Sequence, residues 1–207
     1  MAKKNSSILF NSVAPVYGLF YNMQKRRFAE VIEGVANELD LSAFETIIDV
    51  GCGTGALCSV LNGKGLSVTG IDPAGKMLEV AKAKQENKDI SFMQADVLVG
   101  LPFEDNSFDI AIASYVAHGL KVEERKLMYA EMSRVASHYV VIYDYNENRS
   151  LFTTFVEWLE GGDYFHFIKN AEPEMKDCVS ELKSCFTDVR VVDVDTRAAW
   201  YICMPLA

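Results

Sequence analysis

Three glycines at alternate positions follow an apolar run in the first third of the chain. Residues 47–55 read Ile-Ile-Asp-Val-Gly-Cys-Gly-Thr-Gly, which predicts a buried strand, a glycine turn and then a helix. Glycine lets a ligand approach the main chain, and it accepts backbone angles that a β-carbon obstructs. The first amides of the helix attract electron-rich groups, and Thr54 is the expected cap. The turn is therefore a candidate site for a small polar ligand, although such turns also serve tight packing alone.

A carboxylate stands at a suitable distance from this turn. Residues 66–71 predict a second strand that ends on Asp72, which follows Gly51 by 21 positions. About 20 positions separate the first glycine from the ribose-binding acid in nucleotide sites. A carboxylate can accept hydrogen bonds from two adjacent hydroxyls. The alternative is that Asp72 caps the helix that follows Pro73, and one side chain can do both.

Four segments, in this order along the chain, resemble the class I S-adenosylmethionine-dependent methyltransferases. They are IIDVGCGTGAL, VTGIDPAGKML, the QADV that follows the third predicted strand, and LPFEDNSFDIAIASYVAHGL. The segment FNSVAPVYGLFYN further resembles small methyltransferases of ubiquinone and menaquinone biosynthesis. The resemblance covers about residues 10–204. It implies a Rossmann-like, doubly wound α/β fold with seven strands, mostly parallel, that closes with an antiparallel C-terminal hairpin.

The resemblance also implies a cofactor, S-adenosylmethionine, and residues that hold it. Asp49 and the turn at 51–53 would hold the methionine part, Asp72 the ribose, and Asp96 with the Val97 amide the adenine. The full set expected at the cofactor is Tyr21, Asp49, Gly51, Cys52, Gly53, Thr54, Gly55, Asp72, Pro73, Met77, Asp96, Val97 and Ser114. Met77 would pack on the adenine, although a methionine at helical spacing is more often a core residue. We expect no metal site.

The residues after the fourth predicted strand are the candidates for catalysis. Methyl transfer is a direct displacement, so positioning the acceptor about 3 Å from the methyl carbon supplies most of the rate. Ser114 and Tyr115 should border the methyl group. His118 is the leading candidate for a general base, because its ordinary pKa of about 6.5 suits proton transfer near neutrality. Its alternative role is structural, behind the cofactor. We expect a small-molecule acceptor, aromatic or partly apolar.

Apolar runs alternate with helix-like segments, which is typical of a parallel sheet covered on both faces. We expect strands at 46–50, 67–71, 90–94, 109–114 and 139–143, a final hairpin at 189–194 and 198–204, and helices from 56, at 75–84 and at 123–135. A single domain would span residues 1–207. Two helical additions would lie near the strand ends: an N-terminal cap at 1–40 and an insertion at 146–184 over the active site.

Composition fits an ordinary globular enzyme. The chain has 207 residues, of which 50% are hydrophobic and 24% charged. The formal net charge of −9 disfavours nucleic acid as a partner, since binding would need a local basic patch. Five cysteines without metal spacing indicate reduced thiols and a cytoplasmic location. We expect no membrane span, and the sequence leaves the oligomeric state open.

Two other functions stay open at this point. Gly51, Gly53 and Ala56 also fit the relaxed dinucleotide pattern G-x-G-x-x-G/A of nicotinamide-dependent oxidoreductases. The Asp96 segment and the C-terminal hairpin disfavour that class. A noncatalytic module that only binds S-adenosylmethionine is also compatible, because methyl transfer needs no obligatory nucleophile in the protein.

Overall fold

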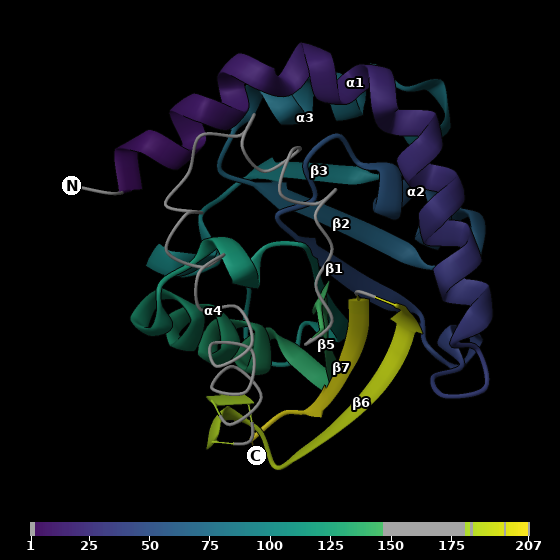
Figure 1. Cartoon of the computed structure of the whole chain (residues 1–207), viewed down its shortest axis with the longest axis vertical. Helices are drawn as coiled ribbons and strands as arrows, with labels where there is room; N and C mark the ends of the chain where they lie inside the picture. The colour runs from purple at the N-terminus through teal and green to yellow at the C-terminus, as the bar shows by residue number, and fades with distance from the viewer. Residues whose placement is uncertain (1–2, 147–180, 183, 197, 207) are drawn as a thin grey trace.

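Seven strands form one mixed sheet in the computed structural model of the chain (Figure 1), which describes residues 3–146, 181–182, 184–196 and 198–206. Their order across the sheet is β3-β2-β1-β4-β5-β7-β6. The first five in this order are parallel, and β7 pairs antiparallel with β5 and β6. The predicted Rossmann-like fold, with its C-terminal hairpin, is confirmed. The strands are β1 Thr46–Val50, β2 Ser67–Asp72, β3 Ser91–Gln94, β4 Phe108–Ser114, β5 Ala136–Tyr145, β6 Asp188–Asp195 and β7 Ala198–Met204.

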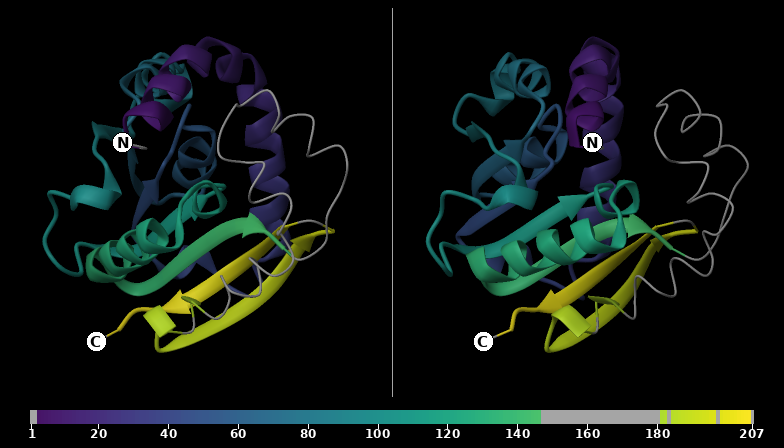
Figure 2. Two further views of the ribbon diagram at one scale, coloured as in Figure 1. Left: turned by 60° about the vertical axis from the view of Figure 1, so that its left-hand side comes forward. Right: turned by 90° about the vertical axis from the view of Figure 1, so that its left-hand side faces the viewer.

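Helices cover both faces of this sheet. In the described part of the chain they are α1 Lys3–Gly34, α2 Ala56–Gly63, α3 Gly75–Lys82 and α4 Val122–Val135. Short 3-10 turns occur at η1 Leu41–Ala43, η2 Gln85–Asn87, η3 Val97–Val99 and η4 Ala117–Gly119. The helices α1, α2 and α3 lie on one face, and α4 lies on the other (Figures 1 and 2).

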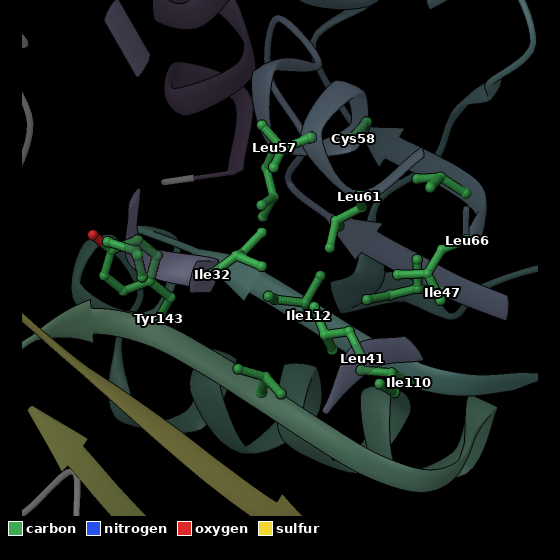
Figure 3. Close-up of a cluster of buried hydrophobic side chains, with 14 of the residues drawn as sticks. Ile32, Leu41, Ile47, Leu57, Cys58, Leu61, Leu66, Ile110, Ile112 and Tyr143 are labelled. Carbon is green, nitrogen blue, oxygen red and sulfur yellow. The ribbon is translucent and has the colours of Figure 1, made fainter. Parts of the chain in front are cut away.

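Alternating side chains of the strands build two separate cores. Ile47 of β1 points to the α1 and α2 face, where it belongs to a cluster of buried side chains that includes Ile32 and Leu61 (Figure 3). Its neighbour Ile48 points to the opposite face, where it packs with Met128 of α4. Burial of one such side chain stabilises the fold by roughly 1.5–3 kcal/mol. Because both faces are covered, the strands read as nearly continuous apolar runs.

The first half of α1 lies beside the loop that follows β2. Ala14 packs against Ala74 and Met77, and the Asn11 side-chain oxygen accepts the backbone N–H of Lys76 at 2.9 Å. The helix bends along its length (Figure 2) and contains Pro15, which cannot donate a backbone hydrogen bond. The N-terminal addition is thus one long helix that flanks the strand ends next to Asp72.

The largest difference from the predicted boundaries is at the start of β5, and one predicted segment lies outside the described residues. β5 begins at Ala136 and not at Tyr139, because α4 ends at Val135 and the chain passes straight into the strand. Most of the predicted insertion at 146–184 falls among the residues that the structure does not describe. None of the helices in the described ranges is both long and apolar enough to cross a membrane.

Candidate active site

The glycine turn adopts a backbone that only glycine accepts without strain. Gly51, Gly53 and Gly55 have φ angles of 75°, 53° and 76°, all in the left-handed region. The amides of Gly51 and Cys52 both donate to the Ile71 carbonyl, at 2.8 and 2.9 Å, which ties the turn to the end of β2. A β-carbon placed on Gly53 would meet no atom within 4 Å. The turn is therefore open at Gly53, where a ligand can approach the main chain.

The predicted cap of α2 is wrong. Gly55 occupies the N-cap position with a left-handed backbone, and no side chain caps this helix. Thr54 is buried, and its hydroxyl donates toward Gln24 Oε1 of α1 at 3.5 Å. Gly55, with its left-handed backbone, stands between Thr54 and the first residue of the helix, so Thr54 is not in the capping position. The Thr54 side chain instead joins the turn to α1.

Asp72 links the turn to the loop before α3. Its Oδ2 accepts the Gly53 N–H at 2.9 Å, and its Oδ1 accepts the Ala74 N–H at 2.7 Å. Burial raises the pKa of this carboxyl group, while the two amides oppose the shift. Each oxygen keeps a lone pair for a further donor. Asp72 is not the cap of α3, because the N-cap position belongs to Ala74 and no side chain caps that helix. Asp72 instead organises the loop through Pro73, and its expected role toward ribose hydroxyls stays a prediction.

Asp49 is buried between β1 and α2. Its side chain is 1% exposed and accepts a hydrogen bond from the Cys58 thiol of α2 at 3.1 Å. Burial raises its pKa to about 7, and the nearby Asp72 adds to the shift. Cys52 in the turn is also buried, which raises the pKa of its thiol. Asp49 therefore faces the interior at α2, and its expected part in holding the methionine end of the cofactor stays a prediction.

Asp96 stands at the end of the strand next to β2. It is the N-cap of η3, with Oδ1 accepting the Leu98 N–H at 2.9 Å, and it is half-buried. The pairing of Asp72 with Gln94 places the ends of β2 and β3 side by side. The Val97 side chain is buried in the core on the α4 face. Asp72 and Asp96 thus occupy neighbouring strand ends, as a site for a nucleoside requires.

Two other residues expected at the cofactor lie in the packing between helices. Tyr21 is 1% exposed; its hydroxyl donates to Asn87 Oδ1 at 3.2 Å, and Lys84 Nζ lies 4.6 Å from the ring centroid. Met77 is 2% exposed and packs with Ala14 of α1. Met77 therefore has the core position that was its alternative, and the Tyr21 hydroxyl is used in joining α1 to η2.

The loop after β4 packs directly on the glycine turn. A β-carbon on Gly51 would lie only 2.6 Å from Cγ2 of Val116. Tyr115 has a φ of 55°, uncommon for a residue other than glycine, and its amide donates to the Tyr143 carbonyl at 2.8 Å. The Ser114 hydroxyl is buried without a hydrogen-bond partner among the described residues. A buried hydroxyl without a partner is costly, which marks Ser114 as a position that a ligand can satisfy.

His118 is held by a carboxylate that sequence reasoning missed. Its Nδ1 lies 2.8 Å from Oδ1 of Asp144, and both side chains are buried. Asp144 lies at the carboxyl end of an apolar strand, one residue before its last, as Asp49 does, so the same pattern was present in the sequence. Tyr115, Tyr143 and Tyr145 surround the pair, with ring centroids of Tyr115 and Tyr143 4.8 Å apart.

Ion pairs occupy two residues of the basic trio at 25–27. Lys25 pairs with Glu86 at 3.3 Å, and Arg27 pairs with Glu30 at 3.4 Å and with Asp195 of β6. These contacts support the interpretation of the trio as a solvated helix face. In the described part of the chain, no group of three or more His, Cys, Asp or Glu side chains is placed to hold a metal ion.

Comparisons with known proteins agree with this geometry. A family model described as a methyltransferase domain matches residues 48–142. An uncharacterised methyltransferase of Staphylococcus carnosus is 30% identical over 120 residues, covering 56% of each chain. A demethylmenaquinone methyltransferase of Paenarthrobacter aurescens is 34% identical over 133 residues, covering 61% of this chain and 49% of the relative. The chain thus spans about half the length of these relatives.

A solved structure shares the whole fold. The crystal structure of a putative S-adenosyl-L-methionine-dependent methyltransferase from Methanococcus maripaludis has a TM-score of 0.70 and 18% identity, covering 95% of this chain and 94% of its own. Residues 48–142 thus match a methyltransferase domain, and the whole chain shares the fold of a structure named as S-adenosyl-L-methionine-dependent. The open approach at Gly53, the remaining lone pairs of Asp72 and the unpartnered Ser114 hydroxyl fit S-adenosylmethionine as a cofactor.

Proposed function

We propose that this protein transfers a methyl group from S-adenosylmethionine to a small-molecule acceptor by direct displacement. The observation that carries the proposal is the bridge from Asp72 to the amides of Gly53 and Ala74, with Asp96 on the neighbouring strand end. Acids at these positions suit a ribose and an adenine amino group, and the open glycine turn suits the methionine part. The proposal takes residues 1–207 as one domain, with the segments 1–40 and 146–184 as additions beside the site.

The residues of this chain then have defined tasks. When bound, S-adenosylmethionine supplies a methyl group on a sulfonium sulfur, which is a good leaving group. Asp72 and Asp96 orient the nucleoside, and the turn at 51–55 holds the methionine part. Ser114 and Tyr115 border the methyl group, and Tyr115 adds an aromatic face that favours a cation. His118 holds or removes a proton of the acceptor where the acceptor needs one.

Three observations support a small acceptor and a location in the cytoplasm. Tyrosines gather at the end of β4 and β5, which suits a compact, partly apolar ring better than a charged polymer. One relative is named for a quinone-type acceptor, demethylmenaquinone. Cys52, Cys58, Cys185 and Cys203 are free thiols, which supports a reducing compartment.

Calorimetry with the purified chain tests the cofactor assignment. Wild type should bind S-adenosylmethionine and its demethylated product with micromolar-range affinity. Asp72→Asn should weaken both by on the order of ten- to a hundredfold, since hydrogen bonds to charged groups contribute roughly 1.5–3 kcal/mol. Asp89→Asn is the matched control, because Asp89 is exposed at the other end of β3. Absence of binding by wild type rejects the proposal.

Two further assays separate the remaining alternatives. Labelled S-adenosylmethionine incubated with protein and a metabolite extract should yield a labelled product, whereas a noncatalytic binding module passes no label. Reduced nicotinamide cofactor should show no change in fluorescence on mixing with the protein. A fluorescence change with no binding of S-adenosylmethionine favours the oxidoreductase instead.

A further inference from the structure

A buried carboxylate at the end of β5 holds both the ring and the backbone of His118. Asp144 Oδ1 lies 2.8 Å from His118 Nδ1, and Oδ2 accepts the His118 backbone N–H at 3.1 Å. Oδ1 also accepts the backbone N–H of Tyr145 at 2.8 Å. The side chains of His118 and Asp144 are only 8% and 4% exposed. The orientation of the imidazole is therefore set by the fold.

These contacts assign the tautomer of the ring. Asp144 already accepts two backbone N–H groups, so it acts as an acceptor, and Nδ1 of His118 must supply the hydrogen of the third bond. In a neutral imidazole the lone pair then belongs to Nε2, on the side of the ring away from Asp144. A carboxylate in this position also stabilises the imidazolium that forms when the ring takes a proton.

The loop that carries His118 packs against the glycine turn. Val116, two residues before His118, packs over Gly51, within 2.6 Å of the position that a β-carbon would take. The short η4 turn then carries the chain from Val116 to His118. The contact fixes the loop 114–119 against the residues proposed to hold the methionine part of the cofactor. His118 is thus on the same loop as Ser114 and Tyr115, the residues proposed to border the methyl group.

The aromatic residues around His118 are not bases themselves. Burial raises the pKa values of Tyr115 and Tyr143, and their hydroxyls lie 3.1 Å apart. Both phenols therefore stay neutral. The ring of Tyr145 packs against His118 with centroids 5.0 Å apart and against Tyr115 at 5.2 Å. Tyr115 is 37% exposed and presents the aromatic surface of this cluster to an incoming molecule.

We propose that Asp144 positions His118 as the general base for an acceptor that is a ring bearing a hydroxyl group; this rests on the proposed methyltransferase function. The hydroxyl proton passes to Nε2 of His118. The electron pair of that oxygen, or of the ring carbon beside it, forms the new bond to the methyl carbon, and the carbon–sulfur pair stays on sulfur. After attack by carbon, that ring carbon loses its own proton to solvent water, and the ring oxygen takes its proton back from His118, which restores the aromatic hydroxyl. Amine and thiol acceptors attack without such a base.

Nitrogen NMR of the cofactor-free protein tests the positioning role without any activity. The spectra of H118Q and H138Q assign the two described histidines, and wild-type His118 should be the Nδ1-protonated tautomer. D144N should shift the ring toward the Nε2-protonated form, because the amide can offer its N–H to Nδ1. A wild-type ring protonated on Nε2 overturns the proposal, and so does an unchanged tautomer in folded D144N. If D144N does not fold, the wild-type spectrum alone decides.

Carbon-labelled methyl transfer tests the acceptor class. With ¹³C-methyl S-adenosylmethionine and a cellular metabolite extract, the product should carry its new methyl on oxygen or on a ring carbon. A methyl on nitrogen or sulfur overturns the proposal. H118Q should lower transfer by about 10²–10⁴-fold while S-adenosylmethionine still binds. H138Q is the matched control, since His138 is exposed beside Asp109 at the opposite end of β5. Equal transfer by H118Q and wild type also overturns it.

The outcomes separate this proposal from the proposed function. Absence of S-adenosylmethionine binding, or binding without transfer to any acceptor, rejects the methyltransferase activity and with it the acceptor class. The NMR result still decides whether Asp144 sets the tautomer of His118. Binding with transfer to an amine or thiol leaves the methyltransferase activity intact and rejects only the acceptor assigned here.

Discussion

The Asp72 carboxylate accepts the backbone N–H of Gly53 at 2.9 Å, which joins the end of β2 to the turn after β1. The same carboxylate accepts from Ala74 at the start of α3. One side chain thus fixes the relative position of two loops that the proposed cofactor must touch. Its removal should affect the free protein as well as the complex.

Asp72→Ala should lower the stability of the protein without cofactor. Two amides lose a buried acceptor, and each such loss costs about 1–3 kcal/mol unless water replaces it. The melting temperature should fall by several degrees, since 1 kcal/mol corresponds to roughly 2–4 °C in a chain of this size. Thermal unfolding measures the change, with Asp89→Ala as control. Equal melting temperatures for the two variants contradict a structural role for Asp72.

Gly53→Ala should fold but bind S-adenosylmethionine poorly. The left-handed backbone at Gly53 costs an alanine about 1–2 kcal/mol, and its methyl group fills the open approach at the turn. Gly63→Ala in α2 is the control, because it too meets no atom within 4 Å but has no positive φ. Calorimetry should show a loss of affinity for G53A alone. Unchanged affinity in G53A would place the ligand elsewhere.

Ser114→Ala should leave the free protein as stable as wild type. Its hydroxyl is buried and has no partner in the described residues, so truncation removes no hydrogen bond there. The change in free energy of unfolding should stay within about 0.5 kcal/mol. Affinity for S-adenosylmethionine should fall about five- to tenfold if the hydroxyl bonds the cofactor. Chemical unfolding and calorimetry measure the two effects, and a large loss of stability with unaltered affinity is the contrary result.

Asp49 should make stability depend on pH. Its pKa in the folded protein is about 7, above the ordinary 3.8. A raised pKa means that the folded state holds the proton more tightly than the unfolded chain. This stabilisation is fully present below about pH 4 and is lost as pH rises through about 7. Wild type should therefore lose stability relative to Asp49→Asn between pH 5 and pH 8, measured by thermal unfolding. Parallel curves for the two proteins contradict the assignment.

Much of the fold could be predicted because apolar runs of strand length alternate with helical patterns. The bounds of β1 and β7 match the expected ranges, since turn residues flank both runs. No turn residues separate α4 from β5, and there the strand begins three residues before its predicted start. The prediction that Thr54 caps α2 was wrong because sequence spacing does not reveal which residue adopts a left-handed backbone.

The candidate site was partly predictable for a related reason. Acids and glycines at strand ends point to a ligand because parallel strands end at one edge of the sheet. Whether such an acid faces a ligand or the interior depends on side-chain direction, so the sequence could not predict that the Asp49 side chain contacts Cys58. The partner of His118 comes from another strand 26 positions later, and no local motif joins them.

A crystal structure with S-adenosylhomocysteine tests the central claim most directly. We expect the ribose hydroxyls within hydrogen-bond distance of Asp72, the adenine amino group at Asp96, and the homocysteine part against the main chain at Gly53. The vacant methyl position should face Ser114 and Tyr115. A nucleoside bound at another edge of the sheet, or side chains of Asp72 and Asp96 turned to bulk water, would contradict the account.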